Sequence, residues 1–236
     1  MFDPHPDLTT SVIFGLGWIY LILALMNAYW TYRVFQRGQH SWLLEKLTGQ
    51  EIPAASTWAL YSILLALVGL AHFVTTSDPE AFLFRMPEWA KNFGNKLADP
   101  VTYFLISIVG FAIVFPLRRW LVKPTVAWVL LNISLLFMAI SMTDYDFRQI
   151  VGKPDNVPIV SMLFIVAFFT WLYFARAVEN DERLKKGEPP TEAVDNEKVL
   201  VWPDLVYTEM ICMIVLTVSL LGWSIGLKAW LEVTAS

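Results

Sequence analysis

Cysteine and histidine are scarce in this chain of 236 residues, and their scarcity excludes several kinds of site. The single cysteine, Cys212, has no partner for an internal disulfide bond, and the chain has no Cys-x-x-Cys-His sequence for covalent haem attachment. The three histidines, His5, His40 and His72, cannot supply the facing pairs that a bis-histidine haem-binding bundle needs. The sequence also lacks zinc-binding patterns, phosphate-binding glycine loops and nucleophilic triads.

Charge is low as well, since Asp, Glu, Lys and Arg make up 16% of the residues whereas 56% are hydrophobic. This apolar content lies far above the soluble average and predicts an integral membrane protein. The net charge of −4 argues against a nucleic-acid partner, because phosphates require a basic face. The N-terminus lacks the basic start and small-residue cleavage site of a signal peptide, so we expect the first span to be retained.

Apolar runs and aromatic residues are abundant. Six stretches have about the length that a helix needs to cross roughly 30 Å of hydrocarbon. We expect spans at residues 11–32, 56–75, 101–122, 124–142, 157–177 and 203–228. The predicted fold class is an all-α integral membrane bundle of six transmembrane helices in a single membrane domain. With 11 Trp, 8 Tyr and 16 Phe, we also expect aromatic packing between helices. In the first span, the residues expected to face other helices instead of lipid are Gly15, Gly17 and Asn27.

Basic residues predict the topology of these spans. Arg33 and Arg37 follow the first span, so the positive-inside rule places that loop in the cytoplasm. Arg118 and Arg119 end the third span on the same side. With six spans, both termini then lie on the outer, periplasmic side of a bacterial inner membrane.

The loops carry further helical signals. Residues 178–201 form a polar cytoplasmic connection, and we expect the fifth helix to extend into it through Leu184. Amphipathic stretches at residues 41–47 and 82–93 predict interfacial helices that lie along the membrane surface.

The sixth span is the one stretch that looks like a signature. Trp202, Pro203 and Asp204 open it, with the proline where its missing N–H is tolerated and the carboxylate at the positive end of the helix dipole. Leu231 and Glu232 close it. These roughly thirty residues resemble the first helix of the C-terminal, subunit IV-like part of cytochrome b in quinol:cytochrome c oxidoreductases. In that family a Trp-Pro or Phe-Pro opens the helix and a Leu-Glu turn ends it.

A shorter match precedes the third span, where Pro87, Glu88 and Trp89 are followed by Asn-Lys-Leu at residues 95–97. In cytochrome b a Pro-Glu-Trp-Tyr sequence opens the loop at the quinol-oxidation pocket. The resemblance implies that Pro87 and Trp89 line a quinone pocket and that Glu88 accepts the quinol proton. Ala90 replaces the family's aromatic residue, and the elements occur in a different order. The alternative is an interfacial helix anchored by Trp89.

Two ionisable residues within the spans are candidates for a functional role. Glu209 sits one turn into the sixth span, where it could take up protons for a quinone site or form an ion pair with Arg176. His72 is the histidine at membrane depth. It could ligate a haem or pigment, with His5 or a partner chain supplying the second ligand, or it could be a hydrogen-bonded packing residue.

We therefore expect a non-haem membrane subunit of a bacterial quinol-linked respiratory electron-transfer complex of the cytochrome bc type, not catalytic alone. The resemblance implies a bound quinone, and it implies haem b and haem c in partner subunits, a cytochrome b-like chain and a c-type cytochrome. We expect no covalently bound cofactor and no metal. The outer acidic residues that could attract a basic carrier are Asp144, Asp146 and Asp155.

Two alternatives come from other functional classes. A small transporter or channel would need polar residues that converge near the midplane, where Asn27 and Asn132 are the main ones. A haem- or pigment-binding membrane anchor would use His72.

Overall fold

The computed structural model describes residues 8–38, 40, 45–46, 49, 52–74, 85–194 and 198–235, with side chains described up to Ile225 in the last helix. Within these residues the chain is helical and contains no strand. Six helices are long and apolar enough to cross a membrane. They are α1 (Thr10–Gln36), α3 (Ala54–Val74), α5 (Pro100–Leu121), α6 (Pro124–Ser141), α8 (Asn156–Lys185) and α10 (Val206–Ala235). The predicted all-α membrane fold with six spanning helices is confirmed.

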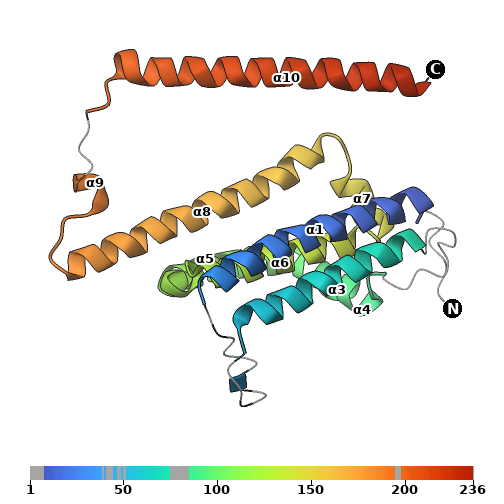
Figure 1. Cartoon of the computed structure of the whole chain (residues 1–236), viewed down its shortest axis with the longest axis horizontal. Coiled ribbons are helices and arrows are strands. Elements are labelled where there is room, and N and C mark those ends of the chain that lie inside the picture. The colour runs from blue at the N-terminus through green and yellow to red at the C-terminus, as the bar shows by residue number, and fades with distance from the viewer. Residues whose placement is uncertain are drawn as a thin grey trace. The chain divides into compact units, whose positions relative to one another are not determined.

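The chain divides into two compact units, Met1–Val178 and Glu179–Ser236. The first contains α1, α3, α5, α6 and most of α8, together with the short helices α4 (Glu88–Leu97) and α7 (Tyr145–Val151) (Figure 1). The second contains the end of α8, α9 (Thr191–Val194), a π-helical turn η3 (Val201–Leu205) and α10. Five of the six candidate spans therefore begin in the first unit.

Three helices extend clearly beyond the predicted spans, and one of them is α10, which reaches Ala235. α1 reaches Gln36, and α8 reaches Lys185, which agrees with the helical extension predicted through Leu184.

The N-terminal end of α5 is set by a capping residue. Asp99 accepts a hydrogen bond from Thr102 N–H at 3.3 Å, just before the N-terminal proline of α5. A turn of only two residues then joins α5 to α6.

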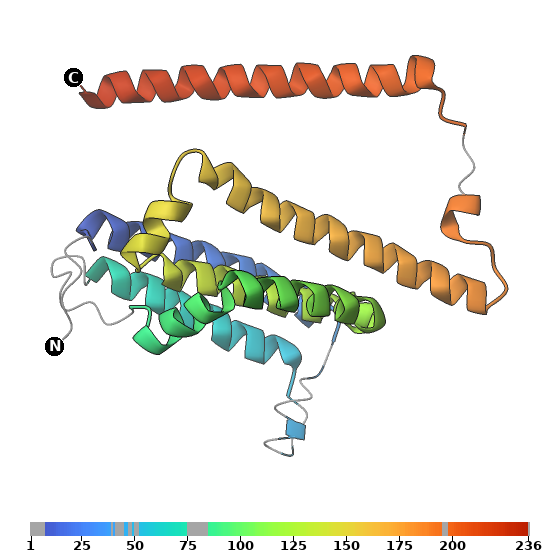
Figure 2. The ribbon, with the colours of Figure 1, turned by 180° about the vertical axis from the view of Figure 1, so that it is seen from behind.

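The tightest packing in the first unit joins α1 to α3, which lie side by side (Figure 1 and Figure 2). They meet at two glycines, because a Cβ atom on Gly69 would lie 3.0 Å from the carbonyl oxygen of Gly17. Ser62 adds an interhelical hydrogen bond, donating to Ala24 O at 2.7 Å. Gly17 faces another helix as predicted. Gly15 is exposed, with no described atom within 4 Å of a Cβ, so the prediction for Gly15 is wrong.

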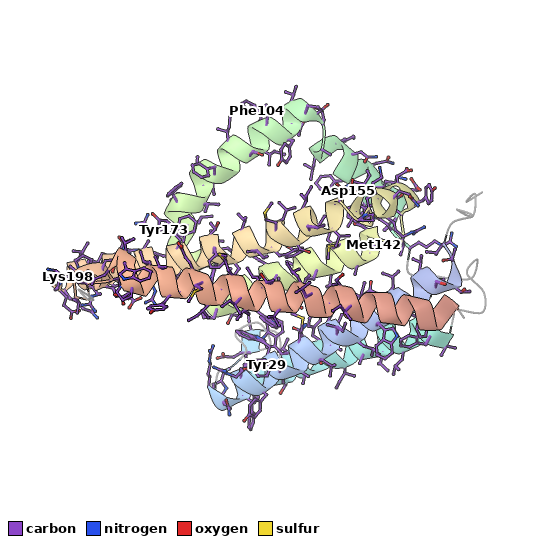
Figure 3. The ribbon with its side chains drawn as sticks, turned by 90° about the horizontal axis from the view of Figure 1, so that it is seen from above. Tyr29, Phe104, Met142, Asp155, Tyr173 and Lys198 are labelled. Atoms are coloured by element: carbon purple, nitrogen blue, oxygen red, sulfur yellow. The ribbon has the colours of Figure 1, made fainter. Side chains whose placement is uncertain are left out.

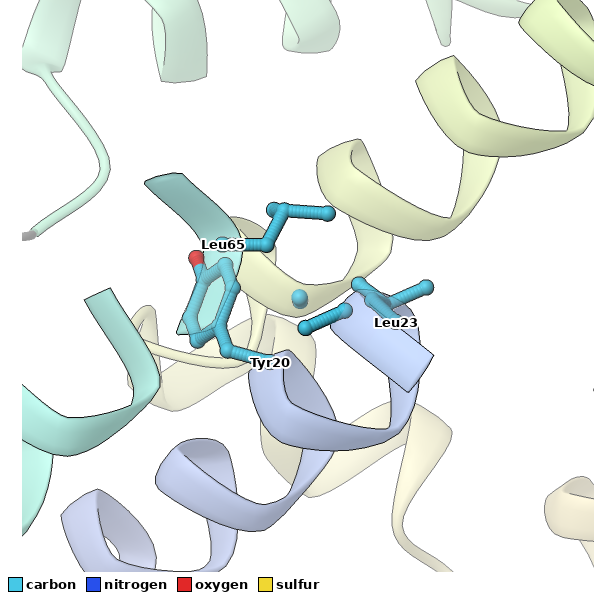
Figure 4. Close-up of a cluster of buried hydrophobic side chains, with 5 residues drawn as sticks. Tyr20, Leu23 and Leu65 are labelled. Atoms are coloured by element: carbon cyan, nitrogen blue, oxygen red, sulfur yellow. The ribbon is translucent and has the colours of Figure 1, made fainter. Parts of the chain in front are cut away.

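A small apolar core extends this contact to α6. The Tyr20 ring of α1 lies beside Leu65 of α3, and Leu23, Ala24 and Ala139 complete the cluster (Figure 4). Each of the five is at most 5% exposed. The core therefore lies where α1, α3 and α6 meet.

Short helices occupy the loops of the first unit. α4 is amphipathic as predicted for residues 82–93, although it begins at Glu88. The other predicted interfacial stretch, residues 41–47, lies almost entirely outside the described residues. α7 is a helix that the polar composition of its loop did not indicate. Its signal is Asp144, which caps the helix by accepting a hydrogen bond from Phe147 N–H at 3.0 Å.

The second unit enters its spanning helix through an irregular turn. Trp202 has an extended backbone, with φ −120° and ψ 131°, and α10 begins only at Val206. Asp204 lies in the first turn as expected, and its carboxylate accepts a hydrogen bond from Leu200 N–H at 3.0 Å. The Trp202 ring stacks on Tyr207 with centroids 5.9 Å apart. The Trp-Pro-Asp sequence thus forms a distinct entrance to α10.

Candidate functional site

Residues 87–89, where the resemblance implies a quinone pocket, lie at the start of α4. Pro87 is the N-cap, Glu88 is the first helical residue and Trp89 is 73% exposed. Glu88 is exposed too, at the positive end of the helix dipole. This arrangement suits an amphipathic helix anchored by Trp89, which is the alternative interpretation of the same sequence.

Lys91 ties α4 to α7. Its ammonium group lies 2.6 Å from Asp144 Oδ2 and 3.7 Å from Asp146 Oδ2. The hydrogen bond to Asp144 raises the pKa of Lys91 above its usual value, and the charges of Asp144, Asp146 and Glu88 add to this effect against the smaller, opposing effect of burial. Asp144 also caps α7, and its side chain is only 10% exposed. Of the three acidic residues that could attract a basic carrier, Asp144 and Asp146 therefore pair with Lys91, while Asp155 is exposed.

His72 is buried between α1 and α3, at 1% exposure. Its Nδ1 lies 2.7 Å from Val68 O, so Nδ1 carries the proton and donates it, because a carbonyl oxygen only accepts. Its ring packs against Tyr20 with centroids 4.9 Å apart. Within the described residues, no group of three or more His, Cys, Asp or Glu could hold a metal ion. The predicted second ligand, His5, lies outside the described residues. This is the geometry of a hydrogen-bonded packing residue.

Glu209 and Arg176 belong to different units. Glu209 lies in the first turn of α10 in the second unit, and Arg176 lies near the end of the first unit in α8. Both side chains are exposed. The ion pair between them and the uptake of protons by Glu209 stay predictions.

The polar residues of the first unit that converge are Asn27 on α1 and Asn132 on α6. Asn27 Nδ2 donates to Asn132 Oδ1 at 2.7 Å and to Leu23 O at 2.9 Å. Asn27 Oδ1 accepts from Trp128 Nε1 at 2.9 Å, and Asn132 Oδ1 accepts from Tyr61 OH at 3.3 Å. Asn132 Nδ2 donates to Trp128 O at 2.9 Å. Every polar atom of the two amides has a partner, so this asparagine network joins α1, α3 and α6 and leaves no amide atom unpaired for a substrate.

A tryptophan stack adjoins the asparagine network. Trp30 lies one helical turn after Asn27 and stacks on Trp128, with centroids 4.7 Å apart and planes 12° apart. Trp58 of α3 packs edge-on against Trp30 at 6.3 Å. The expected aromatic packing between helices is therefore observed. Because Asn27 binds the Trp128 N–H, the network also fixes the ring on which Trp30 rests.

The stacked pair forms part of the wall of a cavity in the first unit, which we call the tryptophan cavity. It lies between α1, α5, α6 and α8 and has a volume of about 620 Å³. Its aromatic lining residues are Trp30, Trp128, Phe164, Phe168, Trp171 and Phe174. The two hydroxyl groups that line it, on Ser134 and Thr170, donate to main-chain carbonyls of their own helices at 2.9 and 2.8 Å. The cavity is therefore mostly aromatic and aliphatic.

Two indole groups of the tryptophan cavity have unused donors. Trp30 Nε1 and Trp171 Nε1 are buried and have no hydrogen-bond partner within the described residues. An indole has one polar atom, which can only donate. Leaving such a donor buried without an acceptor costs about 1–3 kcal/mol. Each of the two nitrogens has less than 1 Å² of accessible surface, so neither N–H is open to the cavity, whose walls are mostly apolar.

Comparisons with family models, with curated proteins and with solved structures find no match for this chain. The tryptophan cavity was not evident from the sequence, because its walls come from four separate helices. A local signal was nonetheless present. Asn27 and Trp30, and likewise Trp128 and Asn132, are one helical turn apart, which places a polar and an aromatic side chain on the same helix face.

Proposed function

We propose that this chain is a non-haem membrane subunit of a bacterial quinol-linked respiratory electron-transfer complex of the cytochrome bc type. In this role it packs against haem-bearing subunits and contributes the walls of a quinone site, without being catalytic alone. The observation that carries the proposal is the tryptophan cavity. Its volume of about 620 Å³ is in the range of ligand sites, roughly 300–1,000 Å³, and its aromatic rings suit a flat apolar ring.

The surroundings of the tryptophan cavity suit a ligand that arrives through the membrane. Its walls come from four helices that are apolar enough to span. α5 and α8 expose apolar side chains over most of their surface, as Phe104 and Tyr173 illustrate at 62% and 68% exposure (Figure 3). A quinone dissolved in the hydrocarbon layer can reach such a cavity without crossing a polar surface.

The same exposed helices provide surface for partner chains. None of the residues of α5, all of which the structure describes, is buried. Lipid or a neighbouring subunit would cover such a helix. The resemblance of residues 202–232 to the cytochrome b C-terminal region supports a cytochrome b-like chain and a c-type cytochrome as partners, which would carry haem b and haem c.

The proposal is tested by extracting the native assembly gently from its membrane and identifying the co-migrating chains by mass spectrometry. We expect a chain with four haem-ligating histidines and a cytochrome with a Cys-x-x-Cys-His sequence. Migration of the chain alone, or only with copies of itself, would contradict the proposal. A transporter or channel would then be the better interpretation, with the asparagine network as its polar centre.

A second experiment separates the two places where a quinone could react. If Glu88 accepts the quinol proton, Glu88→Gln slows quinol oxidation by the intact complex and changes its pH dependence. Because Glu88 is exposed at the start of α4, we expect the turnover to stay unchanged across pH. A slower, pH-shifted turnover would return the quinone site to residues 87–89.

A further inference from the structure

The tryptophan cavity extends from one end of α6 toward the middle of the bundle. Its lining residues on α6 begin at Pro124, the first residue of that helix, and end at Ser134. On α8 they extend from Phe174, in the half nearer its C-terminal end, back to Phe164. Ten residues of α-helix rise about 15 Å, which is half of the roughly 30 Å of hydrocarbon in a bilayer. The cavity is therefore about as long as one leaflet is thick.

Two helices bring a basic side chain to the outer end of the tryptophan cavity. Lys123 is the N-cap of α6 and lies in the chain between two lining residues, Val122 and Pro124. It is exposed and forms no ion pair with another described residue. Arg37, the C-cap of α1, has its guanidinium carbon 5.8 Å from the ring centroid of Trp30, which lines the cavity.

No acidic residue of the adjoining segments balances these charges. Residues 27–38, 118–127 and 170–178 form this end of α1, α5, α6 and α8, and they contain no Asp or Glu. Their basic residues are Arg33, Arg37, Arg118, Arg119, Lys123 and Arg176. α6 also begins here, so the positive end of its helix dipole adds to the field. A negatively charged group is therefore favoured at this end of the cavity.

We propose that the tryptophan cavity binds an anionic phospholipid. One acyl chain lies along the aromatic walls, and the phosphate group lies at the basic end, where Lys123 and Arg37 attract it. The cavity suits an acyl chain because its lining hydroxyl groups, on Ser134 and Thr170, already donate to carbonyls of their own helices. This inference goes beyond the proposed function. An acyl chain and a quinone ring would use the same apolar walls, so the two ligands would compete.

The test measures how tightly the full chain binds two phospholipids that differ in net charge. The protein is purified in detergent and delipidated. Native mass spectrometry at low ionic strength then gives the dissociation constants of dioleoylphosphatidylglycerol, which is anionic, and of dioleoylphosphatidylcholine, which has the same acyl chains and no net charge. A basic residue near the membrane surface changes the affinity for an anionic lipid about fivefold. With two such residues, we expect phosphatidylglycerol to bind about 25-fold more tightly than phosphatidylcholine.

Charge variants assign this preference to the basic end of the cavity. Lys123→Gln and Arg37→Gln should each weaken phosphatidylglycerol binding about fivefold and leave phosphatidylcholine binding unchanged. Both residues are exposed and Lys123 makes no side-chain cap bond, so we expect both variants to fold. Lys153→Gln is the matched control, because Lys153 is an exposed lysine that precedes α8 and does not line the cavity.

A cavity-filling variant tests the place of the acyl chain. Ala167 on α8 lines the cavity, so Ala167→Phe would displace part of the chain while all the basic residues stay in place. Excluding about two methylene groups lowers the affinity about tenfold, and we expect this loss for both phospholipids. Ala112→Phe is the control, because Ala112 is exposed on α5 and is not among the lining residues.

Three results would each overturn the inference. The first is equal affinity for phosphatidylglycerol and phosphatidylcholine. The second is phosphatidylglycerol binding that Lys123→Gln and Arg37→Gln weaken no more than Lys153→Gln does. The third is unchanged lipid binding in Ala167→Phe, which would place the lipid on the surface and outside the cavity. None of these results bears on which chains co-migrate with the protein, so the proposed subunit role is tested separately.

Discussion

Helices α1 and α5 are similar in apolar content, yet they pack in opposite ways. Nine residues of α1 are buried, whereas none of α5, described over its whole length, is buried. Apolar content therefore does not decide which helices pack together in this protein. Apolar content cannot drive helices together in a membrane, because lipid tails are as apolar as leucine side chains. An apolar helix is therefore about as stable against lipid as against another apolar helix.

The position of small and polar residues makes the difference. α1 contributes Gly17 to the contact with α3 and Asn27 to the asparagine network. α5 has a glycine and a serine near the middle of the helix as well, but neither reaches another described helix. A Cβ on Gly110 would have no described atom within 4 Å, and Ser107 donates to Tyr103 O in its own helix at 2.7 Å. Close approach and interhelical hydrogen bonds therefore hold α1, whereas Gly110 and Ser107 provide neither for α5.

The largest expected effect comes from Gly69→Val, which would fill the closest point between α1 and α3. A Cβ there lies 3.0 Å from both Gly17 O and Leu21 Cγ, so the helices must move apart. We expect the free energy of unfolding to fall by about 2–3 kcal/mol, measured by titration with dodecyl sulfate in mixed micelles. Gly110→Val is the matched control on α5 and should change stability by less than about 0.5 kcal/mol. An equal loss of unfolding free energy for the two substitutions would contradict the conclusion that close packing at glycine holds α1 but not α5.

The asparagine network should give the next largest effect. Asn27→Leu leaves the Trp128 N–H without its acceptor and Asn132 Oδ1 without one of its donors. We expect a loss of about 1–2 kcal/mol in the same titration, because membrane hydrogen bonds are modest but unpaired buried groups are costly. Ser107→Ala on α5 is the control, with an expected change below about 0.5 kcal/mol.

A double substitution sharpens this test. Asn27→Leu combined with Asn132→Leu replaces both amides by apolar groups, so its cost should be smaller than the sum of the two single costs. Strictly additive costs would show that the two amides contribute independently and that their mutual hydrogen bond does not couple α1 to α6.

Features that depend on one segment at a time could be predicted from the sequence. Length and apolar content gave the six spans, and the polar tract after the fifth gave its extension through Leu184. Asn27 faces other helices as expected, since a polar amide avoids lipid. Gly15 marks the limit of such reasoning. It lies two residues from Gly17, about 200° around the helix axis, so the two glycines cannot face the same neighbour.

The site was harder to predict, because it depends on which helices meet. Trp30 and Trp128 are far apart in the chain and become neighbours only through the packing of α1 against α6. The match at residues 87–89 is a local pattern, but a pocket requires other elements to cover it. In the structure Trp89 on α4 is 73% exposed, so the described residues do not cover it to form a pocket.

The smallest expected effect concerns the loop helix that precedes α5. Lys91 joins α4, which has no buried residue, to Asp144 and Asp146 at the start of α7. Lys91→Met removes both ion pairs. Since partly exposed pairs contribute only about 0.2–1 kcal/mol, we expect a loss of about 0.5 kcal/mol at neutral pH. Lys96→Met, at an exposed position of the same helix, is the control and should have no measurable effect.

The pH dependence of this small effect identifies its cause. Pairing raises the pKa of Lys91 above its usual value of 10.5, so folding favours the protonated form. The stabilisation is therefore fully present below that value and is lost as the pH rises through the raised pKa of the folded protein. The stability difference between the unsubstituted protein and Lys91→Met should consequently disappear in strongly alkaline solution. A difference that persists there would mean that Lys91 stabilises α4 through the packing of its aliphatic chain and not through its charge.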